Sequence, residues 1–358
     1  MAVTAQQILD QHGDLLAALS GPLDRSIEIP CSQENPKHGA IAFLAQPQRL
    51  ESLLQSELAV LVIDEKLAGQ AQALLDATAN PGIAVLTTRN TRLAMARING
   101  QYFPLAHVAA PFDGQRIHPS AVIASDCQLG NEVIIGPGAV LHSRVKVGDR
   151  SYIGANTVIE ARTSIGNDCL IYPQVYIGHC CEIGNRVHIK PQSTIGSDGF
   201  GFATNEQGRH TRVPHYGEVI IADDVSIGAN VNIDRGTFAP SRVGRGTCID
   251  NHCHFGHNIV IGEDCMITAG LISAGSVTIG DRCTFAGRVS VNGHISIASD
   301  CVIGPLSGVN NNVTEPGMYA GYPLIGYKEA IKVQASLISV PKLRRSVNRI
   351  LRHLGLDD

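Results

Sequence analysis

The feature that most constrains the fold is a period of six: an apolar residue recurs at every sixth position over more than half of the chain. The period fills fourteen consecutive slots over residues 117–195 without a miss. It resumes over residues 221–233 and, after four extra residues, continues over 243–309 with Ser273 as its one polar slot. A period of six fits neither the turn of an α-helix, about 3.6 residues, nor the alternation of a β-hairpin.

Such a period is typical of a left-handed parallel β-helix, in which three short strands and three corners form one triangular coil. Gly commonly follows a slot residue, and glycine frees the backbone where a corner must turn. The slot residue points inward, and so does the residue two positions before it. We expect small core residues rather than disulfides or metal ligands at the seven cysteines in that second position: Cys127, Cys169, Cys181, Cys253, Cys265, Cys283 and Cys301.

Charge and hydropathy exclude several classes of function. The formal net charge of −4 argues against general nucleic-acid binding, which needs clustered Lys and Arg. One basic stretch, KLRRSVNRILRH at 342–353, could instead dock an acidic partner or simply cap the β-helix. The first residues lack the basic and continuous apolar regions of a signal peptide, and no segment reaches the roughly 18 consecutive apolar residues of a membrane helix. We therefore expect a cytoplasmic protein with no stable membrane insertion.

Three parts are predicted along the chain. Residues 1–112 lack the period and should form a small α/β domain, whereas residues 113–322 should form the β-helix. Residues 323–358 should form a C-terminal helical extension, with Pro341 separating two helical pieces. Within the α/β domain we expect helices near 4–19 and at 90–100, and strands at 40–46, 58–64 and 82–88.

A histidine-rich stretch, HCHFGHNIVIG, follows two interruptions of the repeat, over residues 196–220 and 234–242, which we expect to be extruded loops. Loops expelled from a regular scaffold are where binding residues collect. Stacking by one coil puts Gly275 beside His257 and brings His294 next to the same edge. Adjacent coils are about 4.8 Å apart, so His257 and His294 should lie roughly 10 Å apart. The register therefore predicts a cleft along this edge.

The residues alone leave three interpretations of His257 open. Asp250 lies one side of the triangle earlier, and a carboxylate near an imidazole can fix its tautomer and raise its basicity, as a general base requires. Alternatively, His257 is a solvated corner residue with a backbone hydrogen bond. A zinc site would pair His252 with His257, spaced as in the gamma-class carbonic anhydrases. It needs a further ligand, and the positions one coil later are Gly270 and Gly275.

Six segments occur in the order and spacing of a known family: GSDGFGFA (196–203), NIDRGTF (232–238), IDNHCHFGHNIVIG (249–262), SAGSVTIG (273–280), VNGHISI (291–297) and EPGMYAGYPL (315–324). By these segments the chain resembles the UDP-3-O-(3-hydroxyacyl)glucosamine N-acyltransferases of lipid A biosynthesis over nearly its whole length. The resemblance implies transfer of an (R)-3-hydroxyacyl group from acyl carrier protein to the 2-amine of UDP-3-O-acylglucosamine by a homotrimer. It implies no metal and no cofactor beyond the phosphopantetheine thioester of the carrier protein.

The resemblance also assigns roles at the histidine edge. His257 matches the family's general base, and Asp250 matches the aspartate that pairs with it. Gly275 matches the glycine whose N–H stabilises the oxyanion, and His294 matches a histidine near the thioester and the pantetheine arm. Asn251, in the same motif as the base, belongs to the predicted substrate-binding set.

Further substrate-binding residues follow from the family's other segments. The N-terminal domain is expected to bind uridine, with Phe43, Gln46 and Arg49 in the stretch FLAQPQR where the family usually has F-x-x-N-P-x-Y. Arg49 replaces the second aromatic residue, and a guanidinium can also stack on a base. Phe200 and Phe202 complete the set. Because of Arg49, a hexapeptide acyltransferase for another nucleotide-sugar amine is the alternative enzyme, and a non-catalytic β-helix scaffold is the alternative outside enzymes.

Overall fold

The computed structural model describes residues 3–78, 82–103, 112–321 and 327–356. The chain splits into two compact units, Met1–Val108 and Ala109–Asp358. The predicted boundaries at residues 112 and 322 lie beside segments outside the described residues, so the division into three parts stays a prediction.

The first unit is the α/β structure that the sequence predicted. Its elements are β1 (Val3–Thr4), α1 (Ala5–His12), β2 (Leu16–Ser20), β3 (Ser26–Ile27), β4 (Ile29–Pro30), β5 (Ala40–Leu44), η1 (Pro47–Arg49), α2 (Leu50–Leu54), β6 (Val60–Asp64), η2 (Glu65–Leu67), α3 (Ala68–Thr78), β7 (Ala84–Thr88) and α4 (Thr91–Tyr102). One sheet has the order β2-β7-β6-β5-β4. Alternate residues of its central strands pack with α1 and α4 on one face and with α2 and α3 on the other. Burial on both faces explains why these strands are apolar throughout.

The prediction of a helix near residues 4–19 is wrong for the second half of that range. Helix α1 ends at His12, and Leu16–Ser20 forms the edge strand β2, antiparallel to β7. Gly13 follows the last helical residue, and glycine is among the least favourable residues in a helix interior. The apolar residues after Gly13 therefore pair with the sheet instead of extending the helix.

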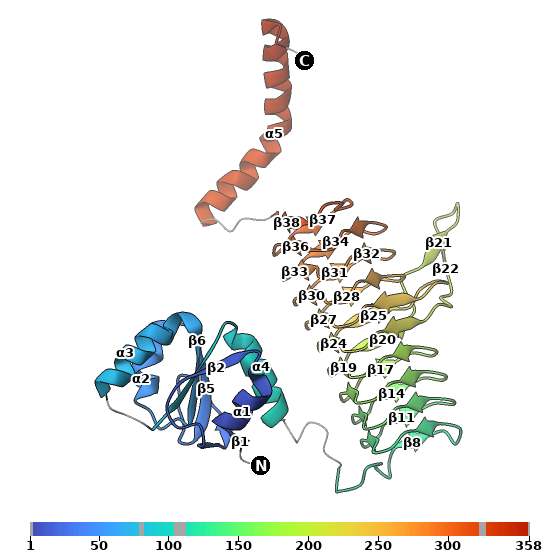
Figure 1. The fold of residues 1–358 in the computed structure, drawn as a ribbon. Helices are drawn as coiled ribbons and strands as arrows, with labels where there is room; N and C mark the ends of the chain where they lie inside the picture. Colours follow the sequence, from blue (N-terminus) through green and yellow to red (C-terminus); the bar gives the residue numbers. More distant parts are fainter. Residues whose placement is uncertain (1–2, 79–81, 104–111, 322–326, 357–358) are drawn as a thin grey trace. The chain divides into compact units, whose positions relative to one another are not determined.

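The second unit is a three-sided parallel β-helix, which confirms the fold predicted from the six-residue period (Figure 1). The first face contains β10 (Ile134–Ile135), β13 (Tyr152–Ile153), β16 (Leu170–Ile171), β19 (His188–Ile189), β24 (Ser226–Ile227), β27 (Cys248–Ile249), β30 (Met266–Ile267), β33 (Thr284–Phe285), β36 (Cys301–Ile303) and β38 (Gly317–Tyr319). The second face contains β8 (Val122–Ile123), β11 (Val140–Leu141), β14 (Val158–Ile159), β17 (Tyr176–Ile177), β20 (Thr194–Ser197), β25 (Asn232–Asp234), β28 (His254–Phe255), β31 (Ile272–Ser273), β34 (Ser290–Val291) and β37 (Gly308–Val309). The third face contains β9 (Gln128–Leu129), β12 (Lys146–Val147), β15 (Ser164–Ile165), β18 (Glu182–Ile183), β23 (Val219–Ile221), β26 (Ser241–Val243), β29 (Val260–Ile261), β32 (Thr278–Ile279) and β35 (Ser296–Ile297).

The interior of the β-helix is filled by the slot residues and by the small residues two positions before them. They form one continuous core along the stack of coils. Of the seven cysteines predicted to point inward, six are buried and Cys127 is half-buried. All ten cysteines are free thiols. The prediction that these cysteines fill the core is confirmed.

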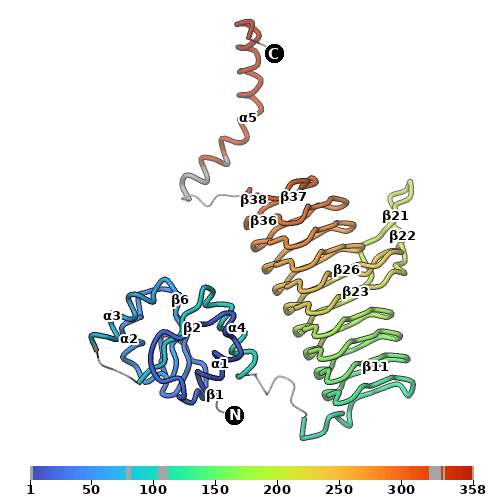
Figure 2. Tube along the Cα trace, viewed as in Figure 1, coloured from blue at the N-terminus to red at the C-terminus, as the bar shows by residue number. Residues whose placement is uncertain are grey.

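The two interruptions of the repeat are loops across which the strands still pair, with one register shift between Ile195 and Ser197. Thr194 pairs with Asn232 across the first loop, and Asn232 pairs with His254 across the second. The first loop contains an antiparallel hairpin of β21 (Phe202–Thr204) and β22 (His210–Arg212). Figure 2 shows this hairpin projecting from the regular coils.

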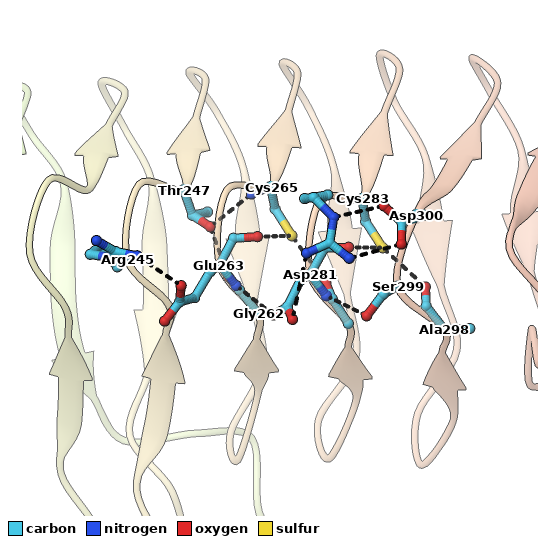
Figure 3. A network of polar contacts seen from close by, with 12 residues as sticks. Arg245, Thr247, Gly262, Glu263, Cys265, Asp281, Cys283, Ala298, Ser299 and Asp300 are labelled. Atoms are coloured by element: carbon cyan, nitrogen blue, oxygen red, sulfur yellow. Dashed lines mark hydrogen bonds and ion pairs between the residues drawn. The ribbon is translucent and has the colours of Figure 1, made fainter.

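Hydrogen bonds between side chains and neighbouring coils tie the stack together (Figure 3). Arg282 donates to both carboxylate oxygens of Asp300, at 2.7 and 2.8 Å, one coil further on. In the interior, the Cys283 thiol donates to the carbonyl oxygen of Ala298 at 3.1 Å. The coils that follow the histidine edge are therefore fixed to one another by side chains as well as by strand pairing.

Helix α5 (Tyr327–Leu354) runs through Pro341, where the sequence predicted a break. Proline removes one backbone donor and kinks a helix more often than it ends one in this setting. Figure 1 shows α5 bending part-way along its length. The predicted helical extension is confirmed, and its separation into two pieces is wrong. Within the described ranges, no helix combines the length and apolarity needed to cross a membrane.

Candidate active site

The edge between the second and third faces brings together three of the predicted catalytic residues. His257 follows β28 at this corner. The N–H of Ser276, next to Gly275, donates to the His257 carbonyl at 2.7 Å, and the N–H of His294 donates to the Gly275 carbonyl at 3.2 Å. His257, Gly275 and His294 therefore occupy successive coils of one edge.

Gly275 lies directly against the imidazole of His257. A Cβ atom at Gly275 would be 2.6 Å from Nε2 and 2.7 Å from Cε1 of His257. Any side chain there would displace the ring, so the position requires glycine. The N–H of Gly275 donates no hydrogen bond to another described residue, which leaves a backbone donor next to Nε2.

A buried carboxylate outside the predicted set of site residues lies beside His254, on the strand paired with β28. Asp234, at the end of β25, is 7% exposed and accepts a hydrogen bond from the Ser197 hydroxyl at 2.9 Å. Its Oδ2 atom is 4.0 Å from Nε2 of His254. Burial raises the pKa of Asp234, and the hydrogen bond from Ser197 and the charges of His254 and His257 oppose that rise. The charge of His215 opposes the rise as well, so Asp234 lies near three imidazoles.

A second imidazole, that of His215, packs beside the base. It comes from the first loop, is 6% exposed, and its ring centroid lies 5.5 Å from that of His257. Gly199 fits between them: a Cβ there would be 2.6 Å from the His257 Cβ and 3.0 Å from Nε2 of His215. Among the described residues, neither ring nitrogen of His215 has a hydrogen-bond partner.

The sequence contained weak signals for these missed residues. Asp234 stands in the quoted segment NIDRGTF, and His254 stands in the histidine stretch. His215 lies in the loop expected to collect binding residues. Their meeting at His257 depends on loop lengths that break the regular count, so stacking by coils could not place them.

Asp250 and Asn251 lie at the preceding corner, between the first and second faces. The Asp250 carboxylate accepts the N–H of Asn251 at 2.7 Å, and Asn251 Oδ1 accepts the N–H of Ala229 at 2.7 Å. None of the hydrogen bonds or ion pairs between described residues joins Asp250 to His257. The pairing of Asp250 with the base therefore stays a prediction, and Asn251 already serves to link two coils.

The zinc interpretation has no support in the arrangement of the histidines. His252 is exposed at the same corner as Asp250, one face away from His257. In the part of the chain that the structure describes, no three His, Cys, Asp or Glu side chains are placed to hold a metal ion.

The predicted substrate-binding aromatics of the first loop lie on its hairpin. Phe200 is 85% exposed, and its ring centroid lies 5.2 Å from that of Phe202 in an edge-on arrangement. With Thr204 and His210 they line a cavity of about 390 Å³. Exposed aromatic rings beside a cavity suit a flat or apolar ligand group.

In the first unit, the three predicted uridine contacts differ in accessibility. Phe43 lies in β5 and its ring is buried in the core. Gln46 and Arg49 are exposed at the two ends of η1, and Arg49 Nε is 4.0 Å from Oε1 of Glu34. Gln46 and Arg49 are accessible to a ligand, whereas Phe43 supports the strand beneath them.

A groove runs along the second face away from His254. It contains a cavity of about 400 Å³. A further cavity of about 440 Å³, at the last coils, shares Asn310 with it and is lined by first-face residues such as Ile303 and Tyr319 as well as by the second face. Ile272 is 56% exposed at its floor, and Gly308 lines the further cavity. The remaining residues of the first cavity are Ser273, Ala274, Ser290, Val291 and Asn292.

A repeat-built β-helix with an imidazole and a free backbone donor at one edge, and a groove on the neighbouring face, defines a transferase of the hexapeptide class. The family model described as "Bacterial transferase hexapeptide (six repeats)" matches residues 126–161 and 162–197. A UDP-3-O-acylglucosamine N-acyltransferase from Methylococcus capsulatus is 38% identical over 352 residues, which cover 98% of this chain and 96% of that protein. The chain belongs to the UDP-3-O-acylglucosamine N-acyltransferase family.

Two further similarities are shorter or more distant. A relative of the same name from Methylorubrum extorquens is 54% identical over 84 residues, which cover 24% of each chain. The crystal structure of an Arabidopsis UDP-N-acetylglucosamine acyltransferase matches with a TM-score of 0.45 and 23% identity, covering 57% of this chain and 71% of that one.

Proposed function

We propose that the protein transfers an (R)-3-hydroxyacyl group from acyl carrier protein to the 2-amine of UDP-3-O-acylglucosamine, giving UDP-2,3-diacylglucosamine in lipid A biosynthesis. Membership of the family supports this activity. The observation that carries it in the structure is Nε2 of His257 lying against Gly275, with a free backbone donor beside it.

In the proposed reaction, the amine nitrogen attacks the thioester carbonyl carbon while Nε2 of His257 removes a proton from that nitrogen. An imidazole is suited to this because it titrates near neutrality. Negative charge develops on the carbonyl oxygen, where the Gly275 N–H would contribute typically ~3 kcal/mol to the barrier reduction. The C–S bond then breaks, and the leaving thiolate takes the proton from the imidazolium. Atoms and charges balance without a covalent enzyme intermediate.

Asp234 and His294 have supporting roles in this scheme. Asp234 interacts electrostatically with His257, so its carboxylate would stabilise the imidazolium that forms during transfer. His294 is exposed on the same edge two coils beyond the base. It is placed to contact the thioester or the pantetheine arm.

The groove and the loop provide separate places for the two substrates. The groove on the second face, with Ile272 on its floor, suits an acyl chain, because apolar surface leaves water there. Phe200 and Phe202 are proposed to contact substrate in the second unit, and Gln46 and Arg49 are proposed to contact uridine in the first unit. Exposed apolar and basic residues of α5, such as Leu343 and Arg345, suit an acidic carrier protein.

We further propose a cytoplasmic homotrimer. Outward-facing apolar side chains on the strands, including Met266 and Ile272, are more than half exposed in the single chain. A closed assembly would cover such surfaces. Cross-linking with mass measurement tests the trimer, and monomeric protein with full activity would exclude it.

The catalytic assignment is tested by His257→Ala, with His252→Ala as the matched control. We expect the His257 variant to lose acyl transfer by about 10²–10⁴-fold, because proton removal contributes that much. His252 is exposed at another corner, so its variant should stay close to the parent rate. The readout is mass-spectrometric transfer from hydroxyacyl carrier protein to UDP-3-O-acylglucosamine. Near-parent activity of the His257 variant would contradict the assignment.

A second candidate function is acylation of another nucleotide-sugar amine, which the exposed Arg49 favours in place of the family's aromatic residue. Comparing acceptor amines with and without uridine separates the two functions. Preference for an acceptor with a different base would replace the leading proposal.

A further inference from the structure

The amide side chain of Asn258 connects the base to the second loop. We infer that Asn258 is a positioning residue that holds His257 in one tautomer, with the proton on Nδ1 and the lone pair on Nε2. This inference rests on the proposed role of His257 as the base. It identifies which group keeps the reactive nitrogen free.

Two backbone groups determine which way the Asn258 amide points. The N–H of Thr237 lies 3.0 Å from Asn258 Oδ1, and the carbonyl oxygen of Ala239 lies 3.0 Å from Asn258 Nδ2. A backbone N–H only donates and a carbonyl only accepts. Reversing the amide would set donor against donor and acceptor against acceptor, so Oδ1 must face Thr237.

The orientation of the amide then settles the protonation of the imidazole. Nδ1 of His257 lies 3.0 Å from the same Asn258 Oδ1. Because that oxygen only accepts, Nδ1 must donate, and a neutral imidazole with a proton on Nδ1 has its lone pair on Nε2. Nε2 is the atom that lies against Gly275. The free lone pair therefore faces the edge where the amine and thioester would meet.

The turn that holds Asn258 is itself braced by the first loop. The N–H of Tyr216 donates to the Thr237 carbonyl at 2.8 Å, and the N–H of Gly217 donates to the Gly236 carbonyl at 2.9 Å. A Cβ at Gly236 would be 1.7 Å from the Ala239 oxygen and 2.7 Å from Asn258 Nδ2. Both insertions thus converge on one amide, which gives them a function beyond substrate contact.

Other titratable groups surround the base and are the same in every variant of Asn258. His215 faces His257 from the first loop, and Asp234 faces it from β25. His254 of β28 reaches it through Asp234. A change in pH dependence on altering Asn258 alone therefore reports the contact with Nδ1.

The test compares Asn258→Leu and Asn258→Asp in the full-length enzyme with the same substitutions at Asn230. Asn230 has a φ of 56° and Asn258 a φ of 60°, so each pair carries the same backbone strain. Asn230 lies at the corner between the first and second faces. We expect Asn258→Leu to lower kcat by about 10–10²-fold, part of the value of a well-placed base, with KM for both substrates little changed.

The aspartate variant gives the readout that a merely structural role would not change. A carboxylate beside Nδ1 accepts the same proton and favours the charged imidazole. We expect part of kcat to return, and the acid limb of the kcat–pH profile to move to higher pH. The Asn230 variants should show neither effect.

Nitrogen NMR of the His257 ring in the parent enzyme tests the tautomer without turnover. The expected spectrum has a protonated Nδ1 and an unprotonated Nε2, and Asn258→Leu should mix the two tautomers. An Nε2-protonated parent, or equal kcat in Asn258→Leu and Asn230→Leu, would overturn the inference. If the tautomer is as expected while His257→Ala stays active, the proposed function has failed and the positioning contact stands.

Discussion

At the residue scale, the site depends on two glycines, which leave room for the His257 ring. Gly275 and Gly199 each lie where a Cβ would be 2.6 Å from an atom of His257. Neither has the positive φ that usually explains a glycine at a corner. Glycine is needed at both positions because the imidazole occupies the space that a side chain would take. The left-handed corner positions on this edge are filled by Asn258, Ser276 and His294 instead.

Gly275→Ala should therefore impair catalysis without unfolding the protein. The added methyl group pushes the His257 ring aside, and a misplaced base costs about 10²-fold. Gly287→Ala is the control, because the nearest atom to its new Cβ would be 3.7 Å away. Transfer rates and thermal melting of both variants are the measurements. Unchanged kcat in Gly275→Ala would show that the ring is free to move.

Replacing the buried His215 by an apolar residue should not reduce the stability of the protein. Its two ring nitrogens are buried without partners among the described residues, and an unsatisfied buried polar group costs free energy. His215→Leu, of similar volume, should leave the free energy of unfolding within about 1 kcal/mol of the parent, or raise it. Urea unfolding measures the change. A loss of several kcal/mol would mean that the imidazole has a partner in the native protein.

The site residues that could be predicted from the sequence are those that follow the regular six-residue period. His257, Gly275 and His294 follow the period without interruption, so counting coils placed them together. Asp234 and His215 reach the same imidazole across extruded loops, whose paths depend on tertiary hydrogen bonds. Counting residues along the sequence gives no information about these hydrogen bonds.

At the element scale, arginine–aspartate pairs link successive coils. Arg150 donates to Asp168 and Arg282 donates to Asp300, each through two hydrogen bonds. The hydrogen bonds from arginine hold the pKa of both carboxyls below their usual value of 3.8. All four side chains are about half exposed, so each pair is screened by water and contributes little alone.

These pairs predict loss of stability in acid. A carboxyl whose pKa is lower in the folded state contributes stability above its usual pKa of 3.8, and this is lost as pH falls through the folded value. The urea midpoint of unfolding should therefore fall as the pH is lowered from about 5 through the folded-state pKa values of these carboxyls. Arg282→Met should make the drop shallower. An identical pH slope in parent and variant would show that the pair contributes nothing.

Element boundaries were predicted less well than element types. The apolar run after His12 joined the sheet as β2 rather than extending α1, because pairing with β7 outweighed local propensity. Pro341 was expected to divide the C-terminal helix, but α5 continues past it. A single missing donor does not end a helix whose neighbouring turns keep their own hydrogen bonds.

At the scale of the whole molecule, the β-helix was predictable because its core residues recur in the sequence with a fixed period of six. All slot residues except the exposed Ile117 and the polar Ser273 pack into or against one continuous apolar interior. The first unit has no such repeat, and only its buried strands and the helix predicted at 90–100, found as α4, were apparent. The uridine contacts illustrate the limit: Phe43 fits the family pattern, yet its ring lies in the core of the unit.

The length of the acyl chain should depend on the far end of the groove. Gly308 lines the cavity of about 440 Å³, and a Cβ there would meet only Asn310 Nδ2, at 4.0 Å. Gly308→Met should fill that space without strain and reduce kcat/KM for the longest accepted acyl chain by about 10–10²-fold. Competition between carrier proteins with different acyl lengths measures this. The same preference in parent and variant would place the chain elsewhere.

The two loops interrupt the chain without interrupting the ladder, since Asn232 pairs with Thr194 on one side and with His254 on the other. Each coil is stabilised by its neighbours, and doubling the length of a flexible loop costs only about 0.6 kcal/mol. Selection can therefore lengthen, shorten or rewrite the exposed hairpin of β21 and β22 with little thermodynamic penalty, whereas the loop residues around His257 and Asn258 are constrained by their contacts. Acceptor preference can diverge between relatives while the body that carries the base stays the same.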